Sequence, residues 1–181
     1  MELRGQRPYG DSVRRIIITL ILVQLAQATP KDIVRGYSER YGVDSLLVYA
    51  VIATESSWDP SAINSGSGCV GLMQINPPFH GRHPVAYYLD AENNIRLGVK
   101  YLSWLLDNFE GDLAKALTGY CYGPYSRAAK AGGSSYSAKV LRRFKALDKK
   151  RKMWVNVNIN CWNTRHIAKT DKRVFSFEGV K

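Results

Sequence analysis

One stretch of the chain, LLVYAVIATESSW from Leu46 to Trp58, constrains the fold and the chemistry more than any other. It has the composition of an apolar helix, and its single acidic residue, Glu55, stands near the end, before the Asp59-Pro60 break. A carboxylate there is poorly solvated and lies near the negative pole of the helix dipole, so we expect its pKa to be raised. A carboxylic acid that keeps its proton near neutral pH suits general acid catalysis, which cleavage of a glycosidic bond requires. The alternative interpretation is an ordinary surface glutamate on the last helical turn.

Helical periodicity continues on both sides of this stretch. Apolar residues spaced four apart predict a short amphipathic helix over about 33–41. Similar patterns predict three further helices, over about 89–109, 112–120 and 136–147. In the last of these, the spacing turns Tyr136 inward together with the other apolar residues of its stripe. The domain is therefore expected to be mainly helical.

Two segments depart from the helical period. Residues 61–79 are rich in glycine and end at Pro77-Pro78, which predicts a tight turn or an irregular hairpin. From Val155 to Cys161, apolar residues alternate with asparagines, which is the period of a strand with one apolar face. Residues 174–177 look like a second strand, so we expect a small C-terminal β-extension. The expected fold class is thus mainly α (α+β).

The positive charge of the chain is concentrated near its C-terminus. Residues 139–181 carry 13 Lys/Arg and 3 Asp/Glu, which accounts for +10 of the net charge of +11. Such a tail favours an anionic partner: a cell-wall polymer, outer-membrane lipid, nucleic acid or an acidic protein. At 181 residues and 45% hydrophobic, the chain can bury one core. We therefore expect one catalytic domain over residues 29–148, followed by a basic linker and β-extension over 149–181.

Residues 1–28 have the three parts of a secretory signal peptide. Arg14-Arg15 precede the apolar run 16–23, and the small-x-small sequence Ala26-Gln27-Ala28 follows it. The run is shorter than the roughly 20 apolar residues that a membrane span needs. The alternative is an N-terminal apolar helix that packs on the domain or contacts a membrane. The first interpretation predicts export to the periplasm or cell envelope.

The sequence shows no pattern typical of a metal site. Its three cysteines, Cys69, Cys121 and Cys161, include no Cys-x-x-Cys pair, and an odd number cannot form a closed set of intrachain disulfides. His80 and His83 have no cysteine or acidic residue nearby to complete a coordination shell, so we interpret them as loop histidines. No metal and no other cofactor is expected.

Four short motifs follow one another along the chain. They are Glu55-Ser56, Gly71-Leu72-Met73-Gln74, Asn94-Ile95 through Gly98 to Tyr101-Leu102, and Tyr120 with Gly123-Pro124. In this order and spacing they resemble the catalytic domain of the soluble lytic transglycosylases (glycoside hydrolase family 23), whose lysozyme-like fold is shared with goose-type lysozyme. The resemblance covers residues 32–147. It departs from the family at Cys121-Tyr122, where Asn-Ala is usual.

The resemblance implies a catalytic glutamate and two helpers. Glu55 matches the catalytic acid/base and Ser56 its partner in the Glu-Ser pair, while Tyr120 matches a tyrosine whose hydroxyl steers the glutamate. The implied reaction cleaves the β-1,4 bond between N-acetylmuramic acid and N-acetylglucosamine in peptidoglycan and forms 1,6-anhydromuramic acid. An inverting hydrolase would need a second carboxylate, and between Pro60 and Leu89 the sequence has no Asp or Glu.

The resemblance also implies residues that bind the glycan. Met73 and Gln74 match cleft residues that hold it. Tyr122 is interpreted as a sugar-stacking platform, because aromatic faces suit the apolar face of a pyranose, or as a filler of the space that the family's smaller residue leaves. Cys69 and Cys121 adjoin two of the motifs, so we expect them near each other beside the cleft, where an exported protein would allow them to pair.

Two other functions stay open from the sequence. One is a muramidase that hydrolyses the same bond with water, and the other is a structural component of a phage virion or a secretion machine with residual lytic activity. The expected partner is the peptidoglycan glycan strand. Further expectations are virion or secretion-complex proteins at residues 149–181 and membrane contact at residues 14–28, whereas nucleic acid is not expected.

Overall fold

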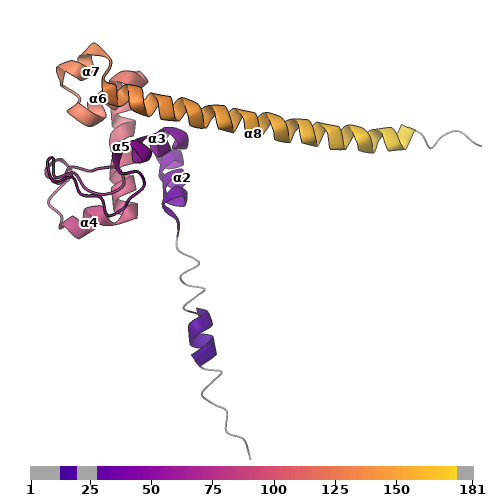
Figure 1. Ribbon diagram of the computed structural model, residues 1–181, viewed down its shortest axis with the longest axis horizontal. Helices are drawn as coiled ribbons and strands as arrows, with labels where there is room; N and C mark the ends of the chain where they lie inside the picture. The colour runs from indigo at the N-terminus through magenta and orange to yellow at the C-terminus, as the bar shows by residue number, and fades with distance from the viewer. Residues whose placement is uncertain (1–12, 20–27, 175–181) are drawn as a thin grey trace, which may run out of the picture.

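The computed structural model describes residues 13–19 and 28–174, with 156–174 described as backbone without side chains. Residues 13–19 form a short helix whose apolar side chains are exposed. The elements that follow are α2 (Pro30–Tyr41), α3 (Ser45–Glu55), the 3-10 helix η1 (Pro77–Phe79), α4 (Val85–Leu89), α5 (Ala91–Asn108), α6 (Leu113–Tyr122), α7 (Arg127–Ala131) and α8 (Ser135–Val174). The expectation of a mainly helical fold is confirmed (Figure 1). The rest of the predicted signal peptide, 1–12 and 20–27, lies outside the described residues.

Helix α3 is the centre of the domain. It begins at Asp44, whose side chain accepts a hydrogen bond from the backbone N–H of Leu46 at 2.8 Å and so caps the helix. Helices α2 and α8 both pack against it (Figure 1). Five of its apolar side chains are buried, and each of the four larger than alanine contributes roughly 1.5–3 kcal/mol. A helix that is apolar on nearly every side is stable only when it is covered in this way.

The glycine-rich segment is an irregular hairpin, as the sequence indicates. Val70 forms isolated antiparallel bridges with Ile63 and with Ile75. Gly71 adopts a positive φ of 77°, and a β-carbon there would collide with the Asn94 side chain and with the carbonyl oxygen of Tyr88. Glycine is therefore required at this turn for both backbone conformation and space.

Helix α5 holds this hairpin in place through Asn94, whose side chain is fully buried. Its Oδ1 accepts a hydrogen bond from the backbone N–H of Met73 at 2.7 Å. Its Nδ2 donates to the carbonyl oxygens of Val70 and Tyr88 at 2.8 and 2.7 Å. One turn further along α5, Gly98 leaves room for the Met73 side chain. Asn94 and Gly98 thus have a structural role, which is to hold the hairpin against α5.

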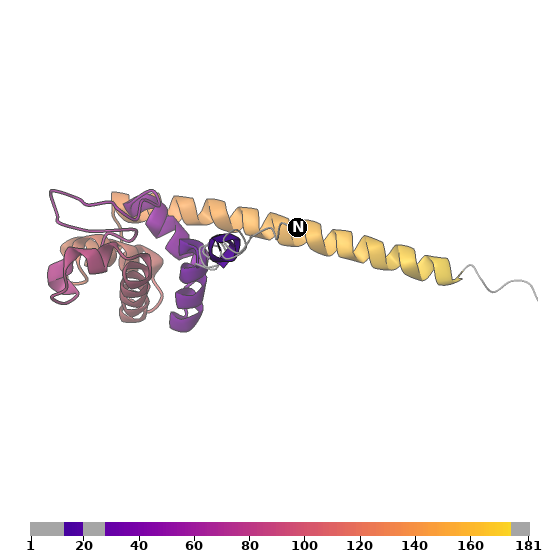
Figure 2. The same cartoon turned by 90° about the horizontal axis from the view of Figure 1, so that it is seen from below.

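Helix α8 is a single helix from Ser135 to Val174, and the predicted strand at 155–161 is wrong. Its first turns pack on α3 and α6, and the remainder extends away from the domain (Figures 1 and 2). Each residue that extends a helix adds its own hydrogen bond, whereas a strand needs a neighbouring strand, which the described residues do not provide. Of the second predicted strand, residues 175–177 lie outside the described residues. No helix in the described part of the chain combines the length and apolar character needed to cross a bilayer.

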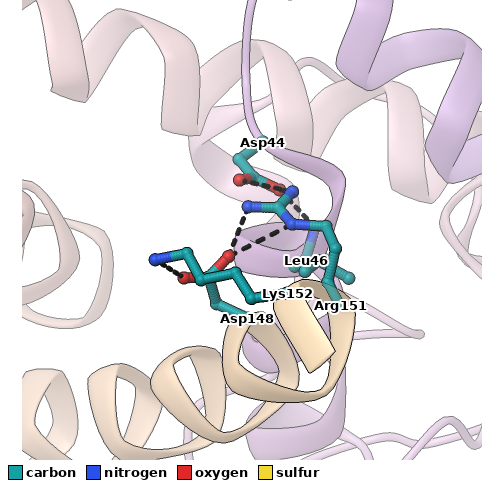
Figure 3. A network of polar contacts seen from close by, with 5 residues as sticks. All are labelled: Asp44, Leu46, Asp148, Arg151 and Lys152. Atoms are coloured by element: carbon teal, nitrogen blue, oxygen red, sulfur yellow. Dashed lines mark hydrogen bonds and ion pairs between the residues drawn. The ribbon is translucent and has the colours of Figure 1, made fainter. Parts of the chain in front are cut away.

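Arg151, on α8, forms an ion pair with Asp44 at the beginning of α3. Its guanidinium lies 3.1 Å from the Asp44 carboxylate and 2.5 Å from that of Asp148, and Lys152 lies 2.8 Å from Asp148 (Figure 3). Asp44 therefore serves both as the cap of α3 and as the partner of α8. These groups are partly solvent-exposed, so the Arg151–Asp44 pair contributes little free energy, and α8 is held mainly by its packing on α3.

Candidate active site

Glu55 is the last residue of α3 and the centre of the site. Its Oε1 accepts a hydrogen bond from the Tyr136 hydroxyl at 2.5 Å. Burial raises the pKa of Glu55, whereas the Tyr136 hydrogen bond and the nearby positive charge of Lys139 lower it, and burial is the largest effect. The raised pKa that the sequence predicts is confirmed. The raised pKa favours the protonated carboxyl that a general acid needs.

Tyr136 is the residue that sequence reasoning missed. It lies in the first turn of α8, and the apolar periodicity of that helix identified it only as an inward-facing core residue. Burial and the charge of Glu55 raise the pKa of Tyr136 far above its usual range, so its hydroxyl stays protonated and donates to Glu55. A buried tyrosine hydroxyl needs a hydrogen-bond partner, and that requirement was the signal available in the sequence.

Tyr120 does not make the contact with Glu55 that the resemblance implied. Its hydroxyl donates to the carbonyl oxygen of Met73 at 2.8 Å, and its ring lies 5.5 Å from that of Tyr101. Burial, together with the charge of Glu55, raises the pKa of Tyr120 well above its usual range. Tyr120 is therefore close to the site, but its hydroxyl binds the hairpin. The hydroxyl that binds Glu55 directly is that of Tyr136. The physical reason is that α6 places Tyr120 opposite a backbone oxygen that needs a donor.

Ser56 and Met73 also support the hairpin. The Ser56 hydroxyl donates to the carbonyl oxygen of Leu72 at 2.9 Å, which joins the end of α3 to the turn. The Met73 side chain is fully buried against Gly98. A buried side chain cannot touch a glycan, so Met73 is corrected from a substrate contact to a packing residue between the hairpin and α5.

Gln74 and Tyr122 remain predicted glycan contacts. Gln74 has a positive φ of 48°, and its Nε2 donates to the carbonyl oxygens of Gly71 and Ala62 at 3.0 and 3.3 Å. This leaves the amide oxygen of Gln74 as the group available to a sugar. Tyr122, at the end of α6, is 52% exposed, as a stacking platform has to be.

The two cysteines beside the site are both free thiols. Burial is the main factor that raises the pKa of Cys121, and the charges of Glu55 and Cys69 add to it. Cys69, Cys121 and Glu55 therefore lie in one region, as the sequence suggested, but the two cysteines do not form a disulfide. The side chain of Cys161 lies outside the described residues.

Asp59, the first acidic residue after Glu55 along the chain, forms hydrogen bonds with its near neighbour Ser61. Its carboxylate accepts hydrogen bonds from the backbone N–H and hydroxyl of Ser61 at 2.8 and 2.6 Å, and these lower the pKa of Asp59. Among the described residues, the groups that act on the pKa of Glu55 include no carboxylate. The site is thus built around one carboxyl group with hydroxyl and ammonium neighbours.

Comparison with known proteins agrees with this geometry. A family model described as the transglycosylase SLT domain matches residues 32–141. The chain belongs to this family. The SLT domain is similar to the membrane-bound lytic murein transglycosylase C of Haemophilus influenzae (strain PittGG), with 39% identity over 55% of this chain and 31% of that protein. The protein of the same name from Mannheimia succiniciproducens is 40% identical over the same shares.

The fold of the SLT domain is also found in a solved structure. Lytic transglycosylase Slt from Pseudomonas aeruginosa, an inactive glutamate-to-glutamine mutant, superposes with a TM-score of 0.56 at 20% identity. The match covers 66% of this chain and 24% of that one, and it confirms the lysozyme-like fold. The chain spans about a third of the length of the curated relatives it matches.

Proposed function

We propose that this SLT domain is a peptidoglycan lytic transglycosylase. It cleaves the β-1,4 bond between N-acetylmuramic acid and N-acetylglucosamine and leaves a 1,6-anhydromuramic acid end. The observation that carries the proposal is the environment of Glu55: a single carboxyl group with a raised pKa, held by the Tyr136 hydroxyl. The family and the names of the similar proteins support it.

In the first step Glu55 acts as the acid. Tyr136 occupies Oε1, so the proton is carried on Oε2 and passes to the glycosidic oxygen. The bond from C1 of muramic acid to this oxygen breaks, and positive charge develops on the sugar ring. Glu55 becomes a carboxylate in this step, and Tyr136 and Lys139 both stabilise the negative charge that appears.

In the second step Glu55 acts as the base. It takes the proton from the C6 hydroxyl of the same muramic acid, and this oxygen bonds to C1. Glu55 is thereby protonated again, as it was before the first step, and no water is consumed. Because the hydroxyl belongs to the bound sugar, its effective concentration at C1 is high. No second carboxylate is needed to activate a nucleophile.

The experiment that tests this proposal is analysis of the products. Peptidoglycan digested by the purified protein should end in 1,6-anhydromuramic acid, which is one water lighter than the hydrolysed product, as mass spectrometry measures directly. Reducing muramic ends as the main product would contradict the proposal and assign the domain as a muramidase. No soluble product, together with binding to peptidoglycan, would assign a structural component.

We further propose where the protein works and how the chain is divided. The relatives named membrane-bound murein transglycosylases favour the cell envelope, reached by export through residues 1–28. Residues 29–148 are the catalytic domain. Residues 149–181 serve location through an anionic wall or assembly partner, in a secretion system, a virion or general wall turnover.

A further inference from the structure

The chain reverses direction immediately after Glu55, in a turn whose backbone is strained. Ser57 and Trp58 have φ values of 54° and 71°, in the left-handed region that residues other than glycine seldom adopt. The backbone N–H of Asp59 donates to the carbonyl oxygen of Ser56 at 3.1 Å and closes the turn. Two successive positive φ values closed by such a bond are typical of a type I′ turn, in which Asn-Gly or Asp-Gly is usual.

Strain of this kind gathers at the proposed active site. Among the described residues, four other than glycine have a positive φ, and three of them, Ser57, Trp58 and Gln74, lie in the two segments that form the site. A bulky side chain in the left-handed region is a genuine outlier, and such a conformation persists only where the surrounding structure holds it. The contacts of the Trp58 side chain therefore show what holds the turn.

The half-buried indole of Trp58 folds back onto α3, the helix that carries Glu55. The centroids of the Trp58 and Tyr49 rings lie 5.5 Å apart, with 59° between their planes. The Nζ atom of Lys31, at the beginning of α2, lies 5.9 Å from the centroid of the indole. The Tyr49 hydroxyl donates to the carbonyl oxygen of Lys31 at 3.3 Å. Both ring contacts are of kinds that stabilise an aromatic side chain, so we refer to Trp58, Tyr49 and Lys31 as the aromatic clamp.

Ser56 attaches the same turn to the hairpin. Its hydroxyl donates to the carbonyl oxygen of Leu72 at 2.9 Å. Glu55 is the last residue of α3, and the end of a helix frays unless the chain beyond it is held. Here the chain after Glu55 is held by the hairpin at one residue and by the aromatic clamp two residues later. The Glu55 carboxyl is thereby kept in the buried position in which Tyr136 donates to it.

We propose that Trp58 is a positioning residue, which holds the end of α3 so that the Glu55 carboxyl stays buried against the Tyr136 hydroxyl. The positive φ values of the turn direct the indole back onto Tyr49, and the contacts of the clamp offset the strain. This inference rests on the proposed function, because it takes Glu55 to be the acid and base of the reaction.

The groups around Glu55 determine how its titration would respond. The titratable ones are hydroxyls, thiols and one ammonium: Tyr120 and Cys121 of α6, Cys69 of the hairpin, and Tyr136 and Lys139 of α8. A substitution at Trp58 leaves all of them in the chain. Any change in the pKa of Glu55 would therefore come from a change in its position.

Loss of the clamp should lower the pKa of Glu55. Burial is the largest cause of the raised pKa, and the Tyr136 hydrogen bond opposes it more weakly. When the end of α3 frays, water reaches the carboxyl and both effects are lost together, so the pKa falls toward its ordinary value. The alkaline limb of the rate profile then moves to lower pH. Removal of the Tyr136 hydroxyl alone leaves Glu55 buried, so it should have the opposite sign.

The test compares Trp58→Gly with two control variants of the full chain. Glycine adopts a positive φ without strain, so Trp58→Gly removes the indole but not the backbone conformation that the turn needs. Trp58→Phe keeps an aromatic ring that can pack on Tyr49. Leu105→Ala, at a fully buried position in the last turn of α5, lowers stability by creating a cavity. Carbon-13 NMR titration measures the pKa of the Glu55 carboxyl, whose signal is assigned by its loss in Glu55→Gln.

Trp58→Gly should lower the pKa of Glu55 and move the alkaline limb to lower pH. Its kcat for release of anhydromuropeptides should fall roughly 10–100-fold with little change in KM, because the misplaced group acts in the transition state. Trp58→Phe should restore most of kcat. Leu105→Ala should lower the melting temperature and leave the pKa of Glu55 in place. All rates are measured below the temperature at which circular dichroism shows unfolding to begin.

The inference is overturned if Trp58→Gly leaves the pKa of Glu55 unchanged or raises it, or if Leu105→Ala lowers that pKa equally. Should Trp58→Gly fail to fold, Tyr49→Leu removes the ring on which the indole packs and is judged by the same two results. The titration needs no substrate and is independent of product analysis. A protein that forms anhydro ends but shows no fall in the pKa loses this inference and keeps its proposed function. A protein that shows the fall but forms reducing ends loses the proposed function, and Trp58 still positions Glu55.

Discussion

The hydrogen bond between Tyr136 and Glu55 makes a specific prediction for Tyr136→Phe. The substitution removes one oxygen atom and leaves the buried ring in place. In the resting enzyme that hydroxyl faces a carboxyl that favours its protonated form, and after proton transfer it faces a carboxylate. A hydrogen bond to a charged group contributes about 1.5–3 kcal/mol and one between neutral groups about 0.5–1.5 kcal/mol. The difference, about 1–1.5 kcal/mol, is stabilisation that appears only as the reaction proceeds.

The expected result is a fall in kcat of about tenfold, because each 1.4 kcal/mol of the barrier corresponds to a factor of ten. The pH profile provides a second readout. The Tyr136 hydrogen bond lowers the pKa of Glu55, so its loss should raise that pKa further and move the alkaline limb of the rate profile to higher pH. The assay is release of anhydromuropeptides from peptidoglycan between pH 4 and 9.

Tyr120→Phe is the matched control for Tyr136→Phe. It removes a hydroxyl that bonds to the neutral carbonyl oxygen of Met73, so it should cost about 1 kcal/mol of stability without moving the alkaline limb. If Tyr136→Phe leaves the pH profile in place, or if both variants shift it equally, the assignment of Tyr136 as the residue that positions Glu55 is refuted.

Four further predictions concern Glu55, Gly98 and Arg151. Glu55→Gln should lower activity by about 10²–10⁴-fold, and residual lysis within tenfold of wild type would contradict the role of Glu55. The same variant should gain thermal stability over wild type as the pH rises above 4.5, because a carboxyl whose pKa is raised on folding costs stability once it ionises; equal melting temperatures from pH 4 to 8 would argue against this. Gly98→Ala should cost about 1–3 kcal/mol in urea unfolding, since its β-carbon collides with Met73, and a stability equal to wild type would show that Met73 can move aside. Arg151→Gln should cost about 0.5 kcal/mol at low salt and less at high salt, because its pair with Asp44 is partly exposed; a cost above about 2 kcal/mol would mean that α8 depends on this contact.

The sequence was sufficient to locate Glu55 because two independent signals agree there. The apolar composition of residues 45–52 requires burial, and a carboxyl at the end of such a helix is buried with it. The hairpin was also predictable, because Gly71 is needed where φ is positive and where Asn94 approaches the backbone. In both cases local composition determines the local structure.

Tyr136 and Met73 could not be assigned correctly from the sequence because their partners are distant along the chain. Tyr136 reaches Glu55 across 81 positions, and periodicity reports only that its side chain faces inward. Met73 stands in a motif associated with the cleft, yet its side chain points down onto Gly98. The direction in which a side chain points from a turn depends on the backbone conformation, which a sequence motif does not specify.

The predicted strand at 155–161 failed for a different reason. Alternation of apolar and polar residues indicates a strand only where a sheet is present to pair with it. Here residues 135–152 already form a helix that is anchored by its packing on α3, and the chain beyond continues it. The sequence pattern was real, but the preceding helix determined the backbone conformation.

Helix α8 connects the parts of the site because it is attached at both ends of α3. Tyr136 contacts Glu55 at the end of α3, and Arg151 contacts Asp44 at its beginning, so the two helices run antiparallel. Between these contacts α8 is one uninterrupted helix. The Tyr136 hydroxyl is therefore presented to Glu55 by a continuous helix that packs along α3, and not by a loop.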